Sequence, residues 1–186
     1  MTAVQNPTTR VSLKTGGTTV TESRRSKATR FTLAGLRLAL GWVFLWAFID
    51  KLFGLGLATP EKGAWINGGS PTNGFLGKAV AGPFEGVYHS IAGAAWADWL
   101  FMLGLAGIGI ALIAGIGMRL AAAAGGVLLV LMWTAVLPPE NNPFMDDHLI
   151  YAGVLAVLAL TAAGDTLGLG KMWARLPVVQ RLPWLK

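Results

Sequence analysis

Four long apolar stretches constrain this chain more than any other feature of its sequence. They cover residues 31–57, 97–116, 120–137 and 149–163. A helix needs about 20 apolar residues to cross the hydrocarbon core of a bilayer. The first two stretches reach that length, and the other two lie near its lower limit. Because helices satisfy their backbone hydrogen bonds internally, the sequence predicts an all-α integral membrane protein built as a four-helix bundle.

The charges between the apolar stretches predict how this bundle is oriented. Bases dominate the segment before the first stretch, the turn between the second and third, and the C-terminal tail: Arg10, Lys14, Arg24, Arg25, Lys27, Arg30, Arg119, Lys171, Arg175, Arg181 and Lys186. The long first loop has balanced charge, and the loop before the last stretch carries only acids. Cytoplasmic segments retain Lys and Arg. We therefore expect both termini in the cytoplasm of a multi-pass protein of the bacterial plasma membrane.

The segments outside the four stretches have distinct compositions. Residues 1–30 contain no apolar run, so we expect a disordered, basic cytoplasmic tail followed by an uncleaved signal anchor. Residues 58–96 carry too many aromatic side chains for a flexible linker, which predicts an ordered extracytoplasmic loop with a short helix near residues 84–94. Residues 165–186 mix Trp with bases and are expected to lie on the cytoplasmic leaflet. We therefore expect the N-terminal tail to be disordered and the long loop to be structured.

Composition excludes several kinds of function. The net charge of +6 belongs to bases that flank lipid spans, which indicates topology signals and attraction to anionic lipid rather than nucleic-acid binding. The chain has no cysteine, which excludes thiolate chemistry and cysteine-ligated iron–sulfur clusters. We expect no metal, haem or cluster. Redox work would need a bound quinone, another cofactor or a partner protein.

Three ionisable residues lie inside the first apolar stretch: Arg37, Asp50 and Lys51. Each costs about 2.5–3.5 kcal/mol to insert on translocon scales, so each needs a partner or a purpose. Arg37 is near the cytoplasmic end, where it can either reach the headgroups or hold a quinone carbonyl or an internal acid. Asp50 and Lys51 point about 100° apart on a helix. We therefore expect each to find a partner on another element.

The predicted topology supplies such partners at the outer end of the bundle. Asp98 begins the second stretch there, and Glu140, Asp147 and His148 precede the fourth, with Tyr151 one turn beyond. Asp146 or Asp147 is placed to cap that helix. Two interpretations stay open for Lys51. Either it forms an ion pair with Asp98 or Asp147, or these residues line a substrate or quinone pocket. A metal site is a weaker third, since no H-x-x-x-H spacing occurs.

Several strings in the chain resemble one membrane protein family. They are LRLALGWVFLWAFIDKLFGLG, WINGGSPTNGFL, NPFMDDHLIY and GLGKMW, which together span roughly residues 33–173. The chain is similar to the DoxX/DoxD-like family, particularly the DoxD-type subunit of thiosulfate:quinone oxidoreductase. The resemblance implies a four-helix bundle that helps oxidise thiosulfate to tetrathionate. Electrons would pass to a membrane quinone, usually with a second subunit, DoxA.

These lines converge on a membrane subunit of a quinone-linked oxidoreductase, with quinone as a bound substrate. The candidate catalytic residues are Lys51, His148, Asp50 and Asp147. In this hypothesis Lys51 and His148 hold thiosulfate anions, and His148 can also exchange protons with a quinol. The candidate pocket residues are Arg37, Asp98, Glu140, Tyr151 and Trp65.

Two other functions compete with this one. The chain could be a non-catalytic scaffold that recruits redox or sulfur-handling enzymes. A small transporter is weaker, because no inverted repeat is visible. The partners implied are the lipid bilayer, a DoxA-like subunit or other redox protein, and a second copy in a homo-oligomer.

Overall fold

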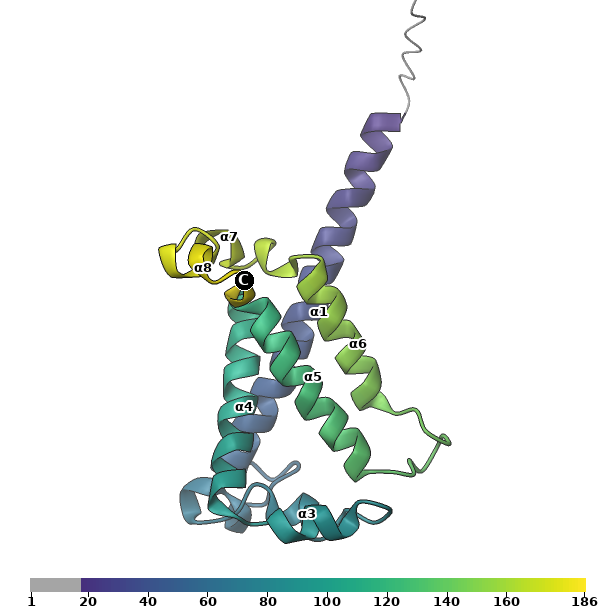
Figure 1. Cartoon of the computed structure of the whole chain (residues 1–186), viewed down its shortest axis with the longest axis vertical. Coiled ribbons are helices and arrows are strands. Elements are labelled where there is room, and N and C mark those ends of the chain that lie inside the picture. Colours follow the sequence, from purple (N-terminus) through teal and green to yellow (C-terminus); the bar gives the residue numbers. More distant parts are fainter. Residues whose placement is uncertain (1–17) are drawn as a thin grey trace, which may run out of the picture.

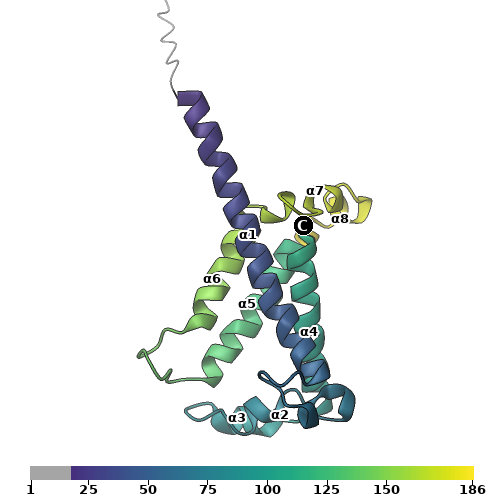
Figure 2. The same cartoon turned by 180° about the vertical axis from the view of Figure 1, so that it is seen from behind.

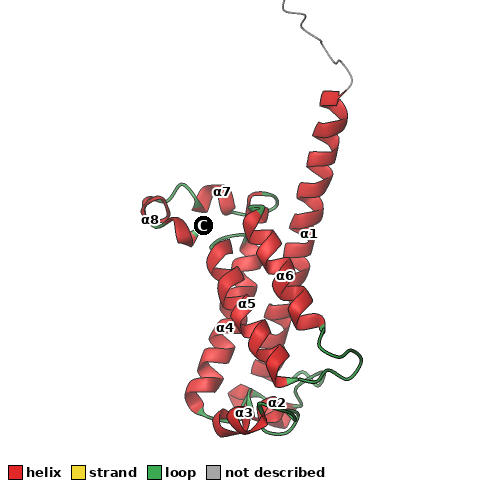
Figure 3. Cartoon of the chain, turned by 45° about the vertical axis from the view of Figure 1, so that its right-hand side comes forward, coloured by secondary structure: helices red, strands yellow, loops and turns green. Residues whose placement is uncertain are grey.

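A computed structural model describes residues 18–186, with side chains from residue 26 onward. Within that range the chain forms helices and no β-strand (Figure 3). Its four longest helices are α1 (Thr18–Phe53), α4 (Ala95–Ala114), α5 (Met118–Ala135) and α6 (Asp147–Leu160). Each begins or ends within a few residues of a predicted apolar stretch, apart from the start of α1. The all-α prediction is confirmed.

Three of these helices are long and apolar enough to cross a membrane. Among the described residues they are Ser26–Phe53 of α1, together with α4 and α5. α6 is apolar but has only 14 residues, a length of about 21 Å against a hydrocarbon core of about 30 Å. It ends earlier than predicted because Ala162 adopts a left-handed backbone conformation (φ 49°).

Both ends of α1 differ from the prediction. The helix already begins at Thr18, so the expectation of disorder is wrong for residues 18–30, while residues 1–17 lie outside the described chain. No glycine or proline interrupts residues 18–34, and the helix projects beyond the bundle there (Figure 1). At the other end α1 stops at Phe53 rather than at residue 57. Gly54 and Gly56 have positive φ angles of 66° and 83°, which a helix does not allow.

The four helices pack as two close pairs, α1 with α4 and α5 with α6, while α4 and α5 are joined by a tight turn. Small residues permit the close approach. A Cβ added to Gly109 would lie 2.7 Å from the Leu45 nitrogen, and one added to Gly125 would lie 2.7 Å from a Leu155 methyl. Lipid tails are as apolar as the helices, so the hydrophobic effect does not drive helices together within a membrane. They associate instead through the close packing that small residues permit. The core between the pairs is apolar, with Leu40, Phe44, Leu105, Ile108, Leu112, Leu129, Leu155 and Leu158 buried.

The connecting segments gather at the two ends of the bundle (Figures 1 and 2). We call one end the loop end; it holds residues 54–94 and 136–146. The segment 54–94 is ordered, with the short helices η1 (Glu61–Gly63), η2 (Trp65–Asn67), α2 (Asn73–Leu76) and α3 (Glu85–Ile91). The predicted short helix is confirmed by α3, whose buried Tyr88 donates its hydroxyl to the Leu131 carbonyl at 2.8 Å.

The opposite end, which we call the tail end, holds residues 115–117 and 161–186. It contains η3 (Ala163–Asp165), α7 (Gly170–Trp173), α8 (Pro177–Arg181) and η4 (Pro183–Leu185). η3 packs against α1 and α6, and η4 packs against α5. The Arg119 amide donates to the Lys186 carbonyl at 2.7 Å, and Trp173 Nε1 donates to the Leu185 carbonyl at 2.6 Å. The predicted tail is therefore a folded part of the molecule.

Candidate functional site

Asp50 is the most unusual side chain of the described structure. It lies in the last turn of α1 and is 1% exposed. Neither of its carboxylate oxygens has a hydrogen-bond partner among the residues that the structure describes. A buried polar group without a partner is costly, and a carboxylate is the costliest kind. The side chain is therefore retained at a cost to stability.

Lys51 lies beside it but faces α4. Its side chain is about half-buried, and Nζ lies 6.0 Å from the centre of the Phe101 ring. That is the outer limit of a cation–π contact. Within residues 26–186 no ion pair involves Lys51. The predicted ion pair with Asp98 or Asp147 is therefore absent from the described side chains, and the ammonium is available to an anionic or carbonyl group.

Asp98 has a defined structural role at the start of α4. Its Oδ1 accepts hydrogen bonds from Ser70 Oγ (2.9 Å), the Thr72 amide (3.0 Å) and Thr72 Oγ1 (2.6 Å). Thr72 Oγ1 in turn accepts from the Gly93 amide at 3.1 Å. Asp98 is only 7% exposed, so this buried carboxylate is compensated, unlike Asp50. It fixes the long loop to α4.

The loop also covers the end of α1. Ala64 is fully buried, and a Cβ added to Gly54 would lie 2.9 Å from the Ala64 methyl. η2 packs against α1, and its Trp65 ring meets Trp99 of α4 edge-on with 4.6 Å between the ring centres. Edge-to-face aromatic pairs are a favourable arrangement. The loop thus closes over the place where α1 meets α4.

Four of the nine predicted site residues therefore belong to one region. Asp50 and Lys51 come from α1, Trp65 from the loop and Asp98 from α4; we call this region the α1–α4 corner. Sequence reasoning missed Ser70 and Thr72, which hold Asp98. The signal was present in the string SPT, because Ser and Thr hydroxyls ahead of a helix commonly bond to nearby polar groups.

The other predicted residues at the loop end lie on the second helix pair. Asp146 caps α6, accepting from the amides of His148 (3.1 Å) and Leu149 (3.3 Å). The predicted acidic cap is therefore confirmed at Asp146. His148 Nδ1 lies 2.6 Å from the other Asp146 oxygen. Asp147 and Glu140 are exposed. Asp146 and His148 thus form a local cap, and no ion pair links it to Lys51 among the described side chains.

Tyr151 follows this cap and packs against the apolar core instead of a polar group. In Figures 1 and 2 the start of α6 lies beside α5, whereas the end of α1 lies beside α4. The expected polar residues do share the loop end, but they fall into two groups along it. One group is the α1–α4 corner and the other is the α6 cap.

Arg37 lies at the tail end, 14 residues before Lys51, a separation of about 21 Å along the helix. It is fully buried, so it does not reach the headgroups. Its guanidinium donates to the backbone carbonyls of Leu112, Ile113 (2.9 Å), Thr166 (3.2 Å) and Leu167 (2.8 Å). The Leu112 and Ile113 carbonyls belong to the last turn of α4, where intrahelical donors run out. Arg37 therefore joins α1, α4 and the segment after α6.

No group of three or more His, Asp or Glu side chains in the described range is arranged to hold a metal ion. The α1–α4 corner instead combines a buried carboxyl, the half-buried ammonium of the next residue and a pair of packed indole rings. The chain matches no protein-family model, no curated protein and no solved structure.

Proposed function

We propose that this chain is the membrane subunit of a quinone-linked oxidoreductase of the DoxX/DoxD-like kind, working on thiosulfate. The chain would span the membrane four times, with α6 as the fourth, shortest span. The support comes from the resemblance in sequence and from the apolar helices. It also comes from the gathering of basic segments at the tail end and of the acidic turn at the loop end. In this proposal the tail end faces the cytoplasm of a bacterium.

The observation that carries the proposal is the unpartnered Asp50 carboxylate beside Lys51. Oxidising two thiosulfates to tetrathionate releases two electrons, and a quinone that accepts them also takes up two protons. A carboxyl group held in an apolar environment can pass a proton to a quinone oxygen or receive one. The Lys51 ammonium can stabilise negative charge that develops on the other oxygen. Asp50 and Lys51 would then be the groups that touch the quinone.

Electrons must reach the quinone from another protein. The chain has no cysteine and no recognisable electron-carrier motif, so a DoxA-like subunit or other redox partner is the expected donor. The share of the reaction that falls to this chain is to bind quinone and move protons. His148 is already bonded to Asp146 and lies outside the α1–α4 corner, so its predicted role in holding thiosulfate needs a separate test.

The test is quinone reduction in membranes that contain this protein with and without a DoxA-like partner. We expect thiosulfate-dependent reduction only when both are present, and a loss of at least tenfold in Asp50→Asn and Lys51→Gln. Lys62→Gln is the matched control, because Lys62 is an exposed base of the same loop end. Membranes that hold both proteins and reduce no quinone with thiosulfate contradict the proposal.

A scaffold role is the second candidate, favoured by exposed apolar side chains at the loop end, where a partner can dock: Ile66, Phe84, Val87 and Phe144. A scaffold predicts a stable complex with a redox or sulfur-handling enzyme. The activity of that complex would survive both Lys51→Ala and His148→Ala. An enzyme subunit predicts that the Lys51 variant, at least, is inactive although the complex still forms.

A further inference from the structure

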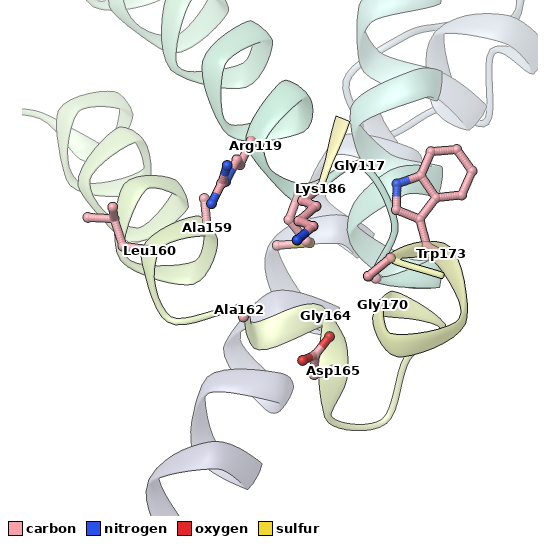
Figure 4. Close-up of a pocket in the computed structure, with 13 residues that line it drawn as sticks. Gly117, Arg119, Ala159, Leu160, Ala162, Gly164, Asp165, Gly170, Trp173 and Lys186 are labelled. Atoms are coloured by element: carbon pink, nitrogen blue, oxygen red, sulfur yellow. The ribbon is translucent and has the colours of Figure 1, made fainter. Parts of the chain in front are cut away.

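A cavity of about 260 Å³ lies at the tail end, far from the α1–α4 corner. The start of α5, the end of α6, η3 and α7 form its walls. Figure 4 shows the Arg119 and Lys186 side chains reaching into the space between α5 and η3. Asp165 lies on the facing wall. Neither the resemblance nor the proposed function assigns a role to this cavity.

Its charge is predominantly positive. A second cavity of about 130 Å³ adjoins it across Ala162 and Asp165, and is lined by Arg30 and Lys171. The two cavities together are lined by four basic side chains (Arg119, Lys186, Arg30 and Lys171) and one acidic side chain, Asp165. The Lys171 and Lys186 side chains make no hydrogen bond or ion pair with another described residue. The two lysine ammonium groups are therefore free to bind an anion.

The position of the cavity relative to the helices sets its depth in the membrane. α4 and α5 have 20 and 18 residues, so they are about 27–30 Å long and match the hydrocarbon core. The cavity opens just beyond the end of α4, the start of α5 and the end of α6. That is the level of the lipid headgroups. Leu160 at its edge is 87% exposed and points away from it (Figure 4).

We propose that this cavity binds the phosphate group of an anionic phospholipid. Basic pockets between membrane helices on the cytoplasmic side suit such headgroups. The volume favours a compact group as well, since sites for drug-sized molecules begin near 300 Å³. The phosphate would lie between Arg119 and Lys186, with Lys171 and Arg30 drawing the remaining headgroup toward the second cavity. Asp165 would accept hydrogen bonds from headgroup hydroxyls such as those of phosphatidylglycerol.

The test measures lipid binding rather than activity, so its outcome is independent of the proposed function. The purified full chain in a neutral detergent is titrated with short-chain phosphatidylglycerol, and binding is followed as a rise in the unfolding temperature. Short-chain phosphatidylcholine, glycerol phosphate and inorganic phosphate are titrated in parallel. We expect phosphatidylglycerol to bind at least tenfold more tightly than each of these three.

Variants then locate the site. Lys186→Gln and Lys171→Gln should each weaken phosphatidylglycerol binding about fivefold, as expected for one charge near a headgroup. The double variant combines Lys171→Gln with Lys186→Gln. Its matched control combines Lys62→Gln with Lys78→Gln, which alter two exposed bases at the loop end. Arg119→Gln is less specific, because Arg119 Nη1 also donates to the Pro183 carbonyl at 3.0 Å.

Two results overturn the proposal. Equal phosphatidylglycerol affinity in the wild type and the Lys171/Lys186 double variant removes the site from this cavity. Inorganic phosphate that binds as tightly as phosphatidylglycerol, and is lost in the same double variant, assigns the cavity to a soluble anion instead of a lipid.

Discussion

Arg37 and Asp50 lie on the same helix and are both inaccessible to solvent, yet their surroundings are opposite. The two terminal nitrogens of the Arg37 guanidinium donate to four backbone carbonyls from two other segments, and only its Nε has no partner in the described chain. The Asp50 carboxylate has no hydrogen-bond partner in the described chain. A buried charge that makes most of its hydrogen bonds within the protein holds a fold together, whereas one that makes none lowers stability and needs another explanation. The comparison separates an end of α1 whose buried charge is bonded to the rest of the fold from an end whose buried charge is not.

Arg37→Met should give the largest effect on stability. It removes the donor from several carbonyls that stay buried, and hydrogen bonds to charged groups contribute about 1.5–3 kcal/mol each. We expect a loss of about 3 kcal/mol, seen as a lower midpoint of thermal unfolding in detergent. Arg119→Met is the control, since Arg119 is exposed and its side chain makes a single hydrogen bond. If the two variants unfold alike, Arg37 is not the structural centre that the comparison requires.

Asp98→Ala should have an intermediate effect, confined to the loop end. Without this acceptor, Ser70 Oγ and both Thr72 donors lose their partner, so we expect a loss of about 1.5 kcal/mol. The measurement is the rate at which a protease cleaves residues 54–94. Asp147→Ala, which alters an exposed acid at the same end, should leave that rate unchanged. We expect the protease to cleave the Asp98 variant faster than the wild type. A variant that is cleaved no faster would show that the loop is held by other contacts.

Lys51→Met should change stability least. The ammonium makes only a distant contact with the Phe101 ring, worth about 0.5 kcal/mol, and the methionine keeps the apolar stem. We therefore expect an unfolding midpoint close to that of the wild type, with quinone reduction lost. A large drop in the midpoint would place Lys51 with Arg37 among the structural charges.

Much of the fold can be predicted from hydropathy. Where the structure differs from that prediction, the cause is a local backbone conformation. The apolar stretches predict α4 and α5 within about two residues at each end, because lipid-spanning length leaves little choice. The ends of α1 and α6 depend instead on backbone conformation at Gly54 and Ala162. Apolar patterning carries no information about such conformations.

The candidate site is harder to predict, because hydropathy does not say which helices are neighbours. Asp50, Lys51 and Asp98 were expected at one end, and they do lie on two paired helices there. His148 was expected with them, but it lies on the α5–α6 pair. Arg37 was beyond sequence reasoning for a different reason. Its partners are backbone carbonyls 75 to 130 positions away, and any residue type can supply those.

The most direct test of the central claim is Asp50→Asn, measured for stability and activity in the same preparation. Asparagine keeps the shape and removes an uncompensated buried charge, so the unfolding midpoint should stay level or rise, by up to about 1 kcal/mol in stability. Thiosulfate-dependent quinone reduction with the partner present should fall at least tenfold. A variant that unfolds more easily than the wild type while keeping full activity would contradict the account, because Asp50 would then belong to the fold.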